Sequence, residues 1–279
     1  MITVSPANDV VGAFIDGVQV ASCSDEELSI IRQAYADHAV VFFRDQELTP
    51  DEHIGFAKRW SRINVNRFFT PVETHPEIAE VRKEPDQTQN IGQEWHTDHS
   101  YDQVPAMGSM LYAREIPPIG GDTLFASQYA AYEALSDGLK KALHDLKAWH
   151  SSRHAFGVNA PMANGEGTLF SNPEAATQDA LHPVVIRHPL SGRPALYVNP
   201  DFTLHFDGWT PDESAPLMQQ LWEHAVSDDF TYRFRWDVGS MAIWDNRALQ
   251  HCALNDYQGH RRLMHRITLE GEPLEAFTA

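Results

Sequence analysis

In the N-terminal part of the chain, two segments with helical signals enclose a short apolar run. Ser24-Asp25-Glu26-Glu27 has the form of a capping box, which predicts a helix extending to about Asp37. Thr49-Pro50-Asp51-Glu52 predicts a second helix, to about Trp60, because Thr is a good N-cap and Pro fits the first helical position. The run AVVFF at residues 39–43 is typical of a buried strand. The fold is therefore expected to begin with a strand flanked by helices.

The middle of the chain alternates between ordered elements and polar connections. Residues 109–114 have a strand-like pattern, and residues 117–121 have the composition of a turn. Residues 127–146 predict one helix, because their apolar positions fall roughly at helical spacing. Residues 83–94 are polar and lack a period, which predicts a loop and a candidate lid. Residues 155–180 are rich in Gly, Asn, Pro and Ala and predict a long excursion.

The last third of the chain has the pattern of a sheet. In residues 230–236 the aromatic side chains occupy alternate positions, as a half-buried strand requires. Residues 241–244 and 262–269 predict two further strands. Strands therefore dominate the centre and C-terminus, and helices lie outside them, which favours a β-sandwich or jelly roll with flanking helices. No break in composition divides residues 1–279, so we expect one domain with a helical N-terminal part and an insert at 155–180.

Composition and charge narrow the class of protein. The chain of 279 residues is 42% hydrophobic, which is typical of a globular protein, and its formal net charge is −18. Such an acidic surface repels phosphate backbones, so a nucleic-acid partner is not expected. Two distant cysteines form no disulfide framework, and we see neither a leader pattern nor an apolar stretch long enough to span a membrane. These features predict a soluble cytoplasmic protein without a membrane partner.

The candidate chemistry begins at Trp95-His96-Thr97-Asp98. Residues i and i+2 of a strand point the same way, so His96 and Asp98 would present an imidazole and a carboxylate side by side. With one distant histidine they would form the two-His, one-carboxylate face of non-haem iron(II) oxygenases. A second His-x-Asp, His205-Phe206-Asp207, shows that this short pattern also arises by chance.

Three motifs in the same order give the chain a more specific resemblance. They are WHTD at 95–98, GGDT at 120–123 and the segment WDNRALQHCALNDYQGHRRLMHRITLEG at 244–271. Together they closely resemble the taurine dioxygenase family, which also includes herbicide-degrading phenoxyacetate dioxygenases and alkylsulfatases. Stretches such as YVNPDF at 197–202 extend the resemblance over nearly the whole chain. The resemblance implies a double-stranded β-helix, which is a jelly-roll core, and dioxygenase activity dependent on iron(II), 2-oxoglutarate and O₂.

Carried over residue by residue, the resemblance implies a metal site and a cosubstrate site. The iron ligands would be His96, Asp98 and His251, and the second His-x-Asp pair would lie outside the site. Thr123 and Arg262 would bind the distal carboxylate of 2-oxoglutarate. This role suits Arg262, because a guanidinium pairs with a carboxylate through two parallel hydrogen bonds. Its place in an otherwise apolar alternating strand also favours an inward position over a solvated one.

A second arginine of the same strand predicts an anionic substrate. Arg266 shares a strand face with Arg262 and Met264, at roughly 13 Å from Arg262 along the strand. In taurine dioxygenases the matching arginine binds the substrate's sulfonate, so a sulfonate, sulfate, carboxylate or phosphonate is expected here. The alternative is that Arg266 pairs with a nearby Asp or Glu.

The expected substrate pocket departs from the taurine-specific pattern. Asn66 occupies the place where taurine-specific members have a histidine, and Phe69 the place of an expected aromatic residue. His99 follows the predicted iron-binding aspartate; in a regular strand its side chain would point away from iron while its N–H could face the substrate. Further candidate walls, each equally compatible with a core role, are Tyr101, Phe156 and Phe202. These departures argue against taurine as the substrate.

The sequence thus predicts a dioxygenase that hydroxylates a small anionic organic compound. Candidates are a sulfonate, a sulfate, an aryloxy acid or another carboxylic acid, and the product would fragment where the oxidised carbon bears sulfur, nitrogen or oxygen. The alternative is a non-catalytic jelly-roll protein that senses an anion or metal. Halogenation is disfavoured because Asp98 fills the position a halide would need, and zinc hydrolysis lacks an obvious general base. A homo-oligomer, dimer or tetramer, is left open.

Overall fold

Two β-sheets carry the core of the fold in the computed structural model, which describes residues 1–160 and 170–278. The large sheet has the order β1-β2-β3-β15-β7-β17-β6-β5, with β4 paired to β17, and the small sheet has the order β14-β8-β16. The strands of the large sheet are β1 (Thr3–Pro6), β2 (Ala13–Asp16), β3 (Val40–Phe43), β4 (Ile63–Asn64), β5 (Pro71–Val72), β6 (His75–Lys83), β7 (Gly108–Glu115), β15 (Met241–Asp245) and β17 (Arg262–Leu269). Those of the small sheet are β8 (Thr123–Ser127), β14 (Thr231–Phe234) and β16 (Leu249–Ala253).

One apolar cluster joins the two sheets. The large sheet contributes Phe42, Leu111 and Met264 to this cluster. The small sheet contributes Phe125 and Phe234, which are buried against them. Phe42 and Phe234 stack at 4.2 Å between ring centroids. This packing of two sheets around a shared core confirms the predicted jelly roll.

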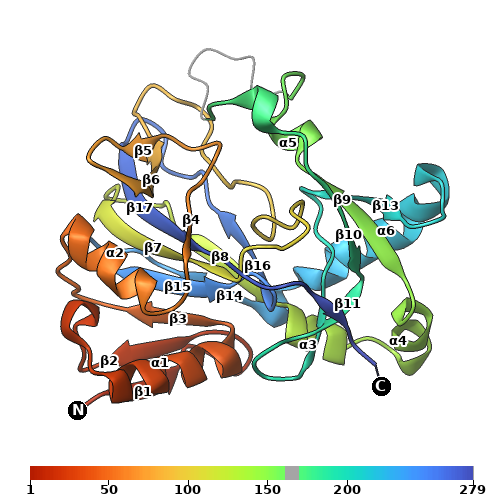
Figure 1. Ribbon diagram of the computed structural model, residues 1–279, viewed down its shortest axis with the longest axis horizontal. Helices are drawn as coiled ribbons and strands as arrows, with labels where there is room; N and C mark the ends of the chain where they lie inside the picture. The colour runs from red at the N-terminus through yellow and green to blue at the C-terminus, as the bar shows by residue number, and fades with distance from the viewer. Residues whose placement is uncertain (161–169, 279) are drawn as a thin grey trace.

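The predicted N-terminal helices cover the other face of the large sheet. They are α1 (Asp25–His38) and α2 (Pro50–Lys58), and each begins with the predicted capping box. Their buried side chains, such as Ile31 and Phe56, pack with Val41 and Met110 of the sheet. The second helix ends at Lys58, two residues before its predicted end. Figure 1 shows both helices beside the N-terminal strands.

A third group of elements lies on the opposite side of the molecule, where Figure 1 shows α4 and α6. It contains two small sheets, in the orders β10-β9-β13 and β12-β11-β18. Their side chains share a separate apolar cluster with the neighbouring helices. The elements are β9 (Lys147–Ser151), β10 (Asp179–Pro183), β11 (Val185–Arg187), β12 (Pro194–Leu196), β13 (Thr203–Phe206), β18 (Glu275–Ala276), α3 (Gln128–Glu133), α4 (Asp137–Leu143), α5 (Arg153–Phe156) and α6 (Pro211–Ala225). Among the described residues there are also three short 3₁₀ helices, η1 (Val20–Ser22), η3 (Pro173–Ala175) and η4 (Asp228–Phe230).

Three predicted elements differ from the structure. The single helix expected at 127–146 is two helices, α3 and α4, because Ser136 begins a new one by accepting a hydrogen bond from the backbone N of Leu139 at 3.3 Å. The strand expected at 230–236 is shortened to β14, since Phe230 belongs to η4. The excursion expected at 155–180 contains η3 and leads into β10, and its residues 161–169 lie outside the described residues. None of the described helices combines the length and apolar character needed to cross a membrane.

Candidate active site

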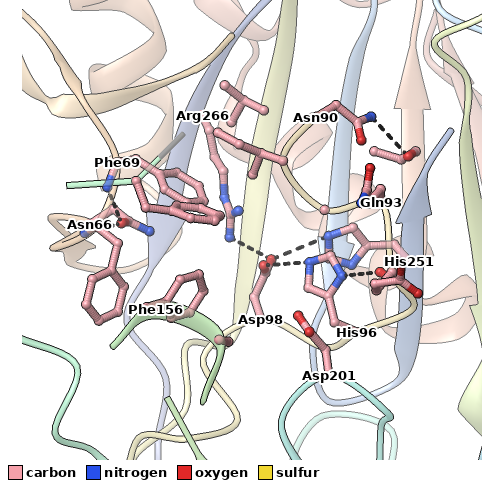
Figure 2. A pocket seen from close by; sticks show the side chains of 18 of the residues that line it. Asn66, Phe69, Asn90, Gln93, His96, Asp98, Phe156, Asp201, His251 and Arg266 are labelled. Atoms are coloured by element: carbon pink, nitrogen blue, oxygen red, sulfur yellow. Dashed lines mark hydrogen bonds and ion pairs between the residues drawn. The ribbon is translucent and has the colours of Figure 1, made fainter. Parts of the chain in front are cut away.

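Two histidines and one aspartate meet in a cavity beside β16. His96, Asp98 and His251 are buried, and each offers one ligand atom within 4.8 Å of the others. Nε2 of His96 lies 3.5 Å from Oδ1 of Asp98, and Nε2 of His251 lies 3.8 Å from Oδ2. Figure 2 shows the two imidazoles and the carboxylate facing one another. The structure therefore brings together the three residues expected to bind iron.

The predicted strand at His96 and Asp98 is wrong, although their side chains do lie side by side. Only His96 pairs with β16, through reciprocal backbone hydrogen bonds with His251 at 3.1 and 2.9 Å. The chain then turns, and the hydroxyl of Thr97 stabilises the turn by donating a hydrogen bond of 2.7 Å to the carbonyl oxygen of Leu249. His99 has a φ of +57°, the left-handed region, so strand alternation cannot continue. Attachment to β16, and not a regular strand, brings the two ligands together.

Three donors engage one oxygen of Asp98. Its Oδ2 lies 2.7 Å from Nη2 of Arg266, 3.1 Å from Oγ of Ser109 and 3.2 Å from Nε1 of Trp244. Burial alone would raise the pKa of Asp98, but the charge of Arg266, which is the largest opposing influence, holds it well below its usual value. The aspartate is therefore ionised, as a metal-binding carboxylate must be.

Hydrogen bonding and burial also prepare the two imidazoles. Nδ1 of His96 lies 2.7 Å from the carbonyl oxygen of Glu94, which orients Nε2 towards Asp98. Burial lowers the pKa of His96, yet the hydrogen bond and charge of Asp98 reverse this and leave the pKa raised. Burial, aided by the neighbouring His96, lowers the pKa of His251 well below its usual value, so this ring is neutral and its lone pair is free to bind a metal.

Arg262 is a buried cation without an acceptor. Among residues 1–160 and 170–278, no hydrogen bond or ion pair engages its guanidinium, and its Nε and Nη2 are fully buried. Its guanidinium carbon lies 5.8 Å from the centroid of the Trp236 ring. A Cβ on Gly121 would lie 3.3 Å from its Cδ, so the glycine leaves room for the arginine. Thr123 lines the same cavity, and because its Oγ1 accepts from Nε1 of Trp236 at 2.9 Å, its hydroxyl hydrogen remains free to donate.

Arg266 lines the cavity with Arg262, as the alternation of β17 predicts. Its Nη2 pairs with Asp98, so the alternative of pairing with an acidic residue is realised, and the partner is a candidate metal ligand. Its Nε is buried without a partner among the described residues, and its guanidinium carbon lies 5.4 Å from the Phe69 ring centroid. Arg266 therefore retains a donor in addition to the one that holds Asp98.

A cavity of about 380 Å³ extends from the candidate ligands, and several aromatic side chains form part of its wall. All the side chains expected to form the substrate pocket line it: Asn66, Phe69, His99, Tyr101, Phe156 and Phe202. Several also pack in one buried aromatic cluster, so a core role and a wall role coincide. The residues of the second His-x-Asp are elsewhere: His205 contacts its neighbour's carbonyl, and Asp207 accepts from Nε1 of Trp149.

Asn66 and His99 meet at one end of this cavity. Oδ1 of Asn66 accepts from the backbone N of Phe68 and of Phe69 at 2.9 and 3.1 Å, which shapes the turn that follows Asn66. Nδ2 of Asn66 lies 3.5 Å from Nε2 of His99. The expectation that the His99 side chain would point away from iron required a regular strand. The turn at His99 instead directs Nε2 of its ring towards Asn66. The other ring nitrogen, Nδ1, lies 3.2 Å from Oδ2 of Asp102.

Sequence reasoning missed three residues of the site. Trp244 begins the motif segment at 244–271, and its indole donates a hydrogen bond to Asp98. Ser109 also bonds Asp98, and its only signal was a polar residue in the apolar run of β7. Asp201 lines the cavity, and its signal was an acidic residue between the apolar positions of YVNPDF. Nothing in their local sequence placed them near the ligands.

A jelly roll that brings two histidines and a carboxylate together in a cavity shared with a buried arginine defines a 2-oxoglutarate-dependent non-haem iron dioxygenase. Comparison with known proteins agrees with this class. The model of the family described as taurine catabolism dioxygenase TauD, TfdA family matches residues 3–268. The chain belongs to this family, whose cofactor is iron(II) and whose cosubstrates are 2-oxoglutarate and O₂.

Relatives with similar sequences and structures cover nearly the whole chain. An (S)-phenoxypropionate/alpha-ketoglutarate-dioxygenase of Sphingobium herbicidovorans is 30% identical over 280 residues, covering 97% of this chain and 95% of the relative. An alpha-ketoglutarate-dependent sulfate ester dioxygenase of Pseudomonas putida is 31% identical over 278 residues, covering 97% and 90%. The crystal structure of a taurine dioxygenase from Burkholderia xenovorans superimposes with a TM-score of 0.81 at 34% identity, covering 97% of this chain and 91% of that one.

Proposed function

We propose that His96, Asp98 and His251 bind iron(II), and that the enzyme uses it to oxidise a small organic anion held in the adjoining cavity. One observation carries this proposal: the buried triad lines the same cavity of about 380 Å³ as Arg262, which has no partner among the described residues. Two imidazoles and one carboxylate suit iron(II) and leave coordination positions open. When bound, iron(II) with 2-oxoglutarate and O₂ supplies the oxidising chemistry, and the protein supplies orientation and exclusion of water.

Arg262 and Thr123 are the proposed partners of the distal carboxylate of 2-oxoglutarate. A buried guanidinium is costly unless an anion compensates it, and Arg262 has no such partner among the described residues. A carboxylate in the cavity would accept from this guanidinium and from the free hydroxyl hydrogen of Thr123. The fit supports a cosubstrate that carries a carboxylate at that end.

The proposed substrate is a small organic anion with a larger apolar body than taurine. The relatives named for phenoxypropionate and sulfate esters support this class. Arg266 would meet the anion with the donors that Asp98 leaves free. Asn66, Phe69, His99, Tyr101 and Phe202 would form the walls, with Phe156 completing the aromatic surface. Asn66 brings an amide where taurine-specific enzymes have a histidine, so the anion would receive less positive charge there.

A substrate screen tests this proposal. The purified protein would be supplied with iron(II), 2-oxoglutarate and O₂, and with small sulfonates, alkyl sulfates, aryloxy acids or phosphonates in turn. We expect succinate formation that rises with one of these classes. The His251→Ala variant should lose it, whereas His205→Ala, which changes the other His-x-Asp, should retain it. A complete panel without substrate-dependent succinate would contradict the proposed substrate class, and equal activity of both variants would contradict the ligand assignment.

A further inference from the structure

One charged side chain of the cavity has no part in the function proposed above. Asp201 lies next to the wall residue Phe202 and is half-buried in the cavity lining. Figure 2 shows it below His96, with its carboxylate turned into the cavity. In this view Asp201 and Arg266 lie on opposite sides of Asp98, so the cavity presents charges of both signs around the candidate metal site.

In the part of the chain that the structure describes, the carboxylate of Asp201 has no compensating partner. Its backbone carbonyl oxygen is held by Nε2 of His154 at 2.6 Å, which fixes the residue in place. Its side-chain oxygens, however, form no hydrogen bond or ion pair with any residue that the structure describes. Burial raises the pKa of Asp201 in spite of the opposing influence of His96 and His154. A partly desolvated carboxylate of this kind is stabilised when a cation or a strong donor binds it.

The cavity that Asp201 lines also has aromatic walls, which suit a cation. The rings of Phe156 and Phe202 lie 5.7 Å apart between centroids, and the Tyr101 ring lies 4.9 Å from that of Phe202. The faces of aromatic rings attract ammonium groups, and the attraction is larger where water is excluded. An acidic group at the edge of an aromatic wall therefore favours an organic cation over a hydrated metal ion.

Resting on the proposed function, we infer that Asp201 binds a positively charged nitrogen group of the substrate. The preferred substrate is then a zwitterion that is longer than taurine, with its anion at Arg266 and its ammonium group between Asp201 and the aromatic wall. The two charged ends would orient the carbon chain between them beside the metal site. Asp201 is thus a specificity-determining residue, because an organic anion without the nitrogen leaves this carboxylate unpaired.

Matched pairs of probes test the inference without requiring turnover. Each pair contains a trimethylammonio-alkanesulfonate and the corresponding tert-butyl alkanesulfonate, which has the same shape but no positive charge, and pairs of increasing chain length form the series. Binding is measured by calorimetry on the full chain with iron(II) and 2-oxoglutarate in the absence of O₂. At the best chain length we expect wild type to bind the ammonium member at least about tenfold more tightly, a difference of about 1.4 kcal/mol.

Two aspartate variants separate recognition from a general loss of structure. Asp201→Asn keeps the shape of the side chain but removes its charge, and it should bring the affinities within a pair close to each other. Asp207→Asn is the control, since Asp207 is exposed, contacts Trp149 and lies outside the cavity; it should keep the preference. A ratio of affinities within a pair does not change when a substitution merely weakens the fold.

The inference is overturned if no chain length favours the ammonium member in wild type, or if Asp201→Asn retains the preference. Succinate formation from the same probes in air distinguishes this failure from failure of the proposed function. A charge preference without succinate from these probes or from the wider panel would support the cation site and contradict the oxidation chemistry. Succinate formation without a charge preference would contradict the cation site and support the oxidation chemistry.

Discussion

Arg262 allows the proposed cosubstrate site to be tested through stability as well as activity. Replacing Arg262 with Met keeps much of the side-chain length but removes the guanidinium. In wild type that guanidinium is buried without an acceptor among the described residues, so it destabilises the protein until an anion binds. We therefore expect the variant to melt at the same temperature as wild type or higher when 2-oxoglutarate is absent.

The same substitution should weaken the binding of 2-oxoglutarate. A hydrogen bond to a charged group contributes about 1.5–3 kcal/mol. Its loss corresponds to an affinity reduced roughly 10- to 150-fold. At a 2-oxoglutarate concentration about 100 times the wild-type Kd, the ligand stabilises wild type by about 2.7 kcal/mol. At that same concentration it should stabilise the variant by only about 0.3–1.4 kcal/mol.

The assay is thermal unfolding of the iron(II)-loaded protein, without O₂, over a series of 2-oxoglutarate concentrations. Arg261→Met provides the matched control. Arg261 precedes Arg262 in the chain but is directed to the surface, where it pairs with Glu115 at 2.6 Å. Its variant should keep the full response to 2-oxoglutarate. A wild-type response in Arg262→Met would refute the assignment, and a strongly lowered melting temperature without ligand would refute the argument that the unpaired guanidinium destabilises the protein.

The remaining predictions concern the metal ligands, their neighbours and the substrate. Asp98→Ala should lose iron(II) binding and substrate-dependent succinate formation, whereas Asp207→Ala should keep both; an active Asp98→Ala variant would contradict the ligand set. Trp244→Phe removes one donor to Asp98 and should weaken iron(II) binding roughly 10- to 100-fold, measured by metal titration; unchanged affinity would show that this hydrogen bond does not orient the ligand. Arg266→Ala also removes a donor to Asp98, so it is assayed at saturating iron(II); there it should raise the substrate KM and let succinate exceed oxidised product while 2-oxoglutarate affinity stays within about threefold; an equal loss of both affinities would refute separate roles for the two arginines. Taurine should be a poor substrate because Asn66 offers an uncharged amide, and efficient turnover of taurine would refute this.

Features fixed by neighbouring residues could be predicted from the sequence. The capping boxes at Ser24 and Thr49 satisfy backbone groups within one turn, so their residues alone predict where each helix begins. The alternation along β17 similarly directs Arg262 and Arg266 to one face. The helix expected at 127–146 failed because apolar spacing continued across Ser136, where a local cap begins a second helix.

Features that depend on contacts between distant segments could not be predicted in the same way. The motifs indicated the candidate ligands, but the local pattern gave the wrong geometry at His96, whose position depends on pairing with His251. The donors to Asp98 and the orientation of Asp201 depend on tertiary packing. The two-residue spacing of His96 and Asp98 does not predict such contacts. His99 illustrates the limit, because its positive φ follows from the turn imposed by these contacts.

The large sheet and the candidate metal site are linked through Asp98. Its three donors come from three adjacent strands: Trp244 from β15, Ser109 from β7 and Arg266 from β17. Trp244 and Ser109 are direct partners in the sheet register, and Arg266 is paired with Leu111, two residues beyond Ser109. A slip of one residue would turn each donor to the opposite face of the sheet. All three donors meet Oδ2, whereas Oδ1 faces Nε2 of His96 at 3.5 Å, on the side where the three candidate ligands meet. The strand register that buries the apolar core therefore also orients the carboxylate of Asp98. Arg266 contacts this carboxylate and also lines the adjoining cavity, so the same register places it beside the proposed substrate.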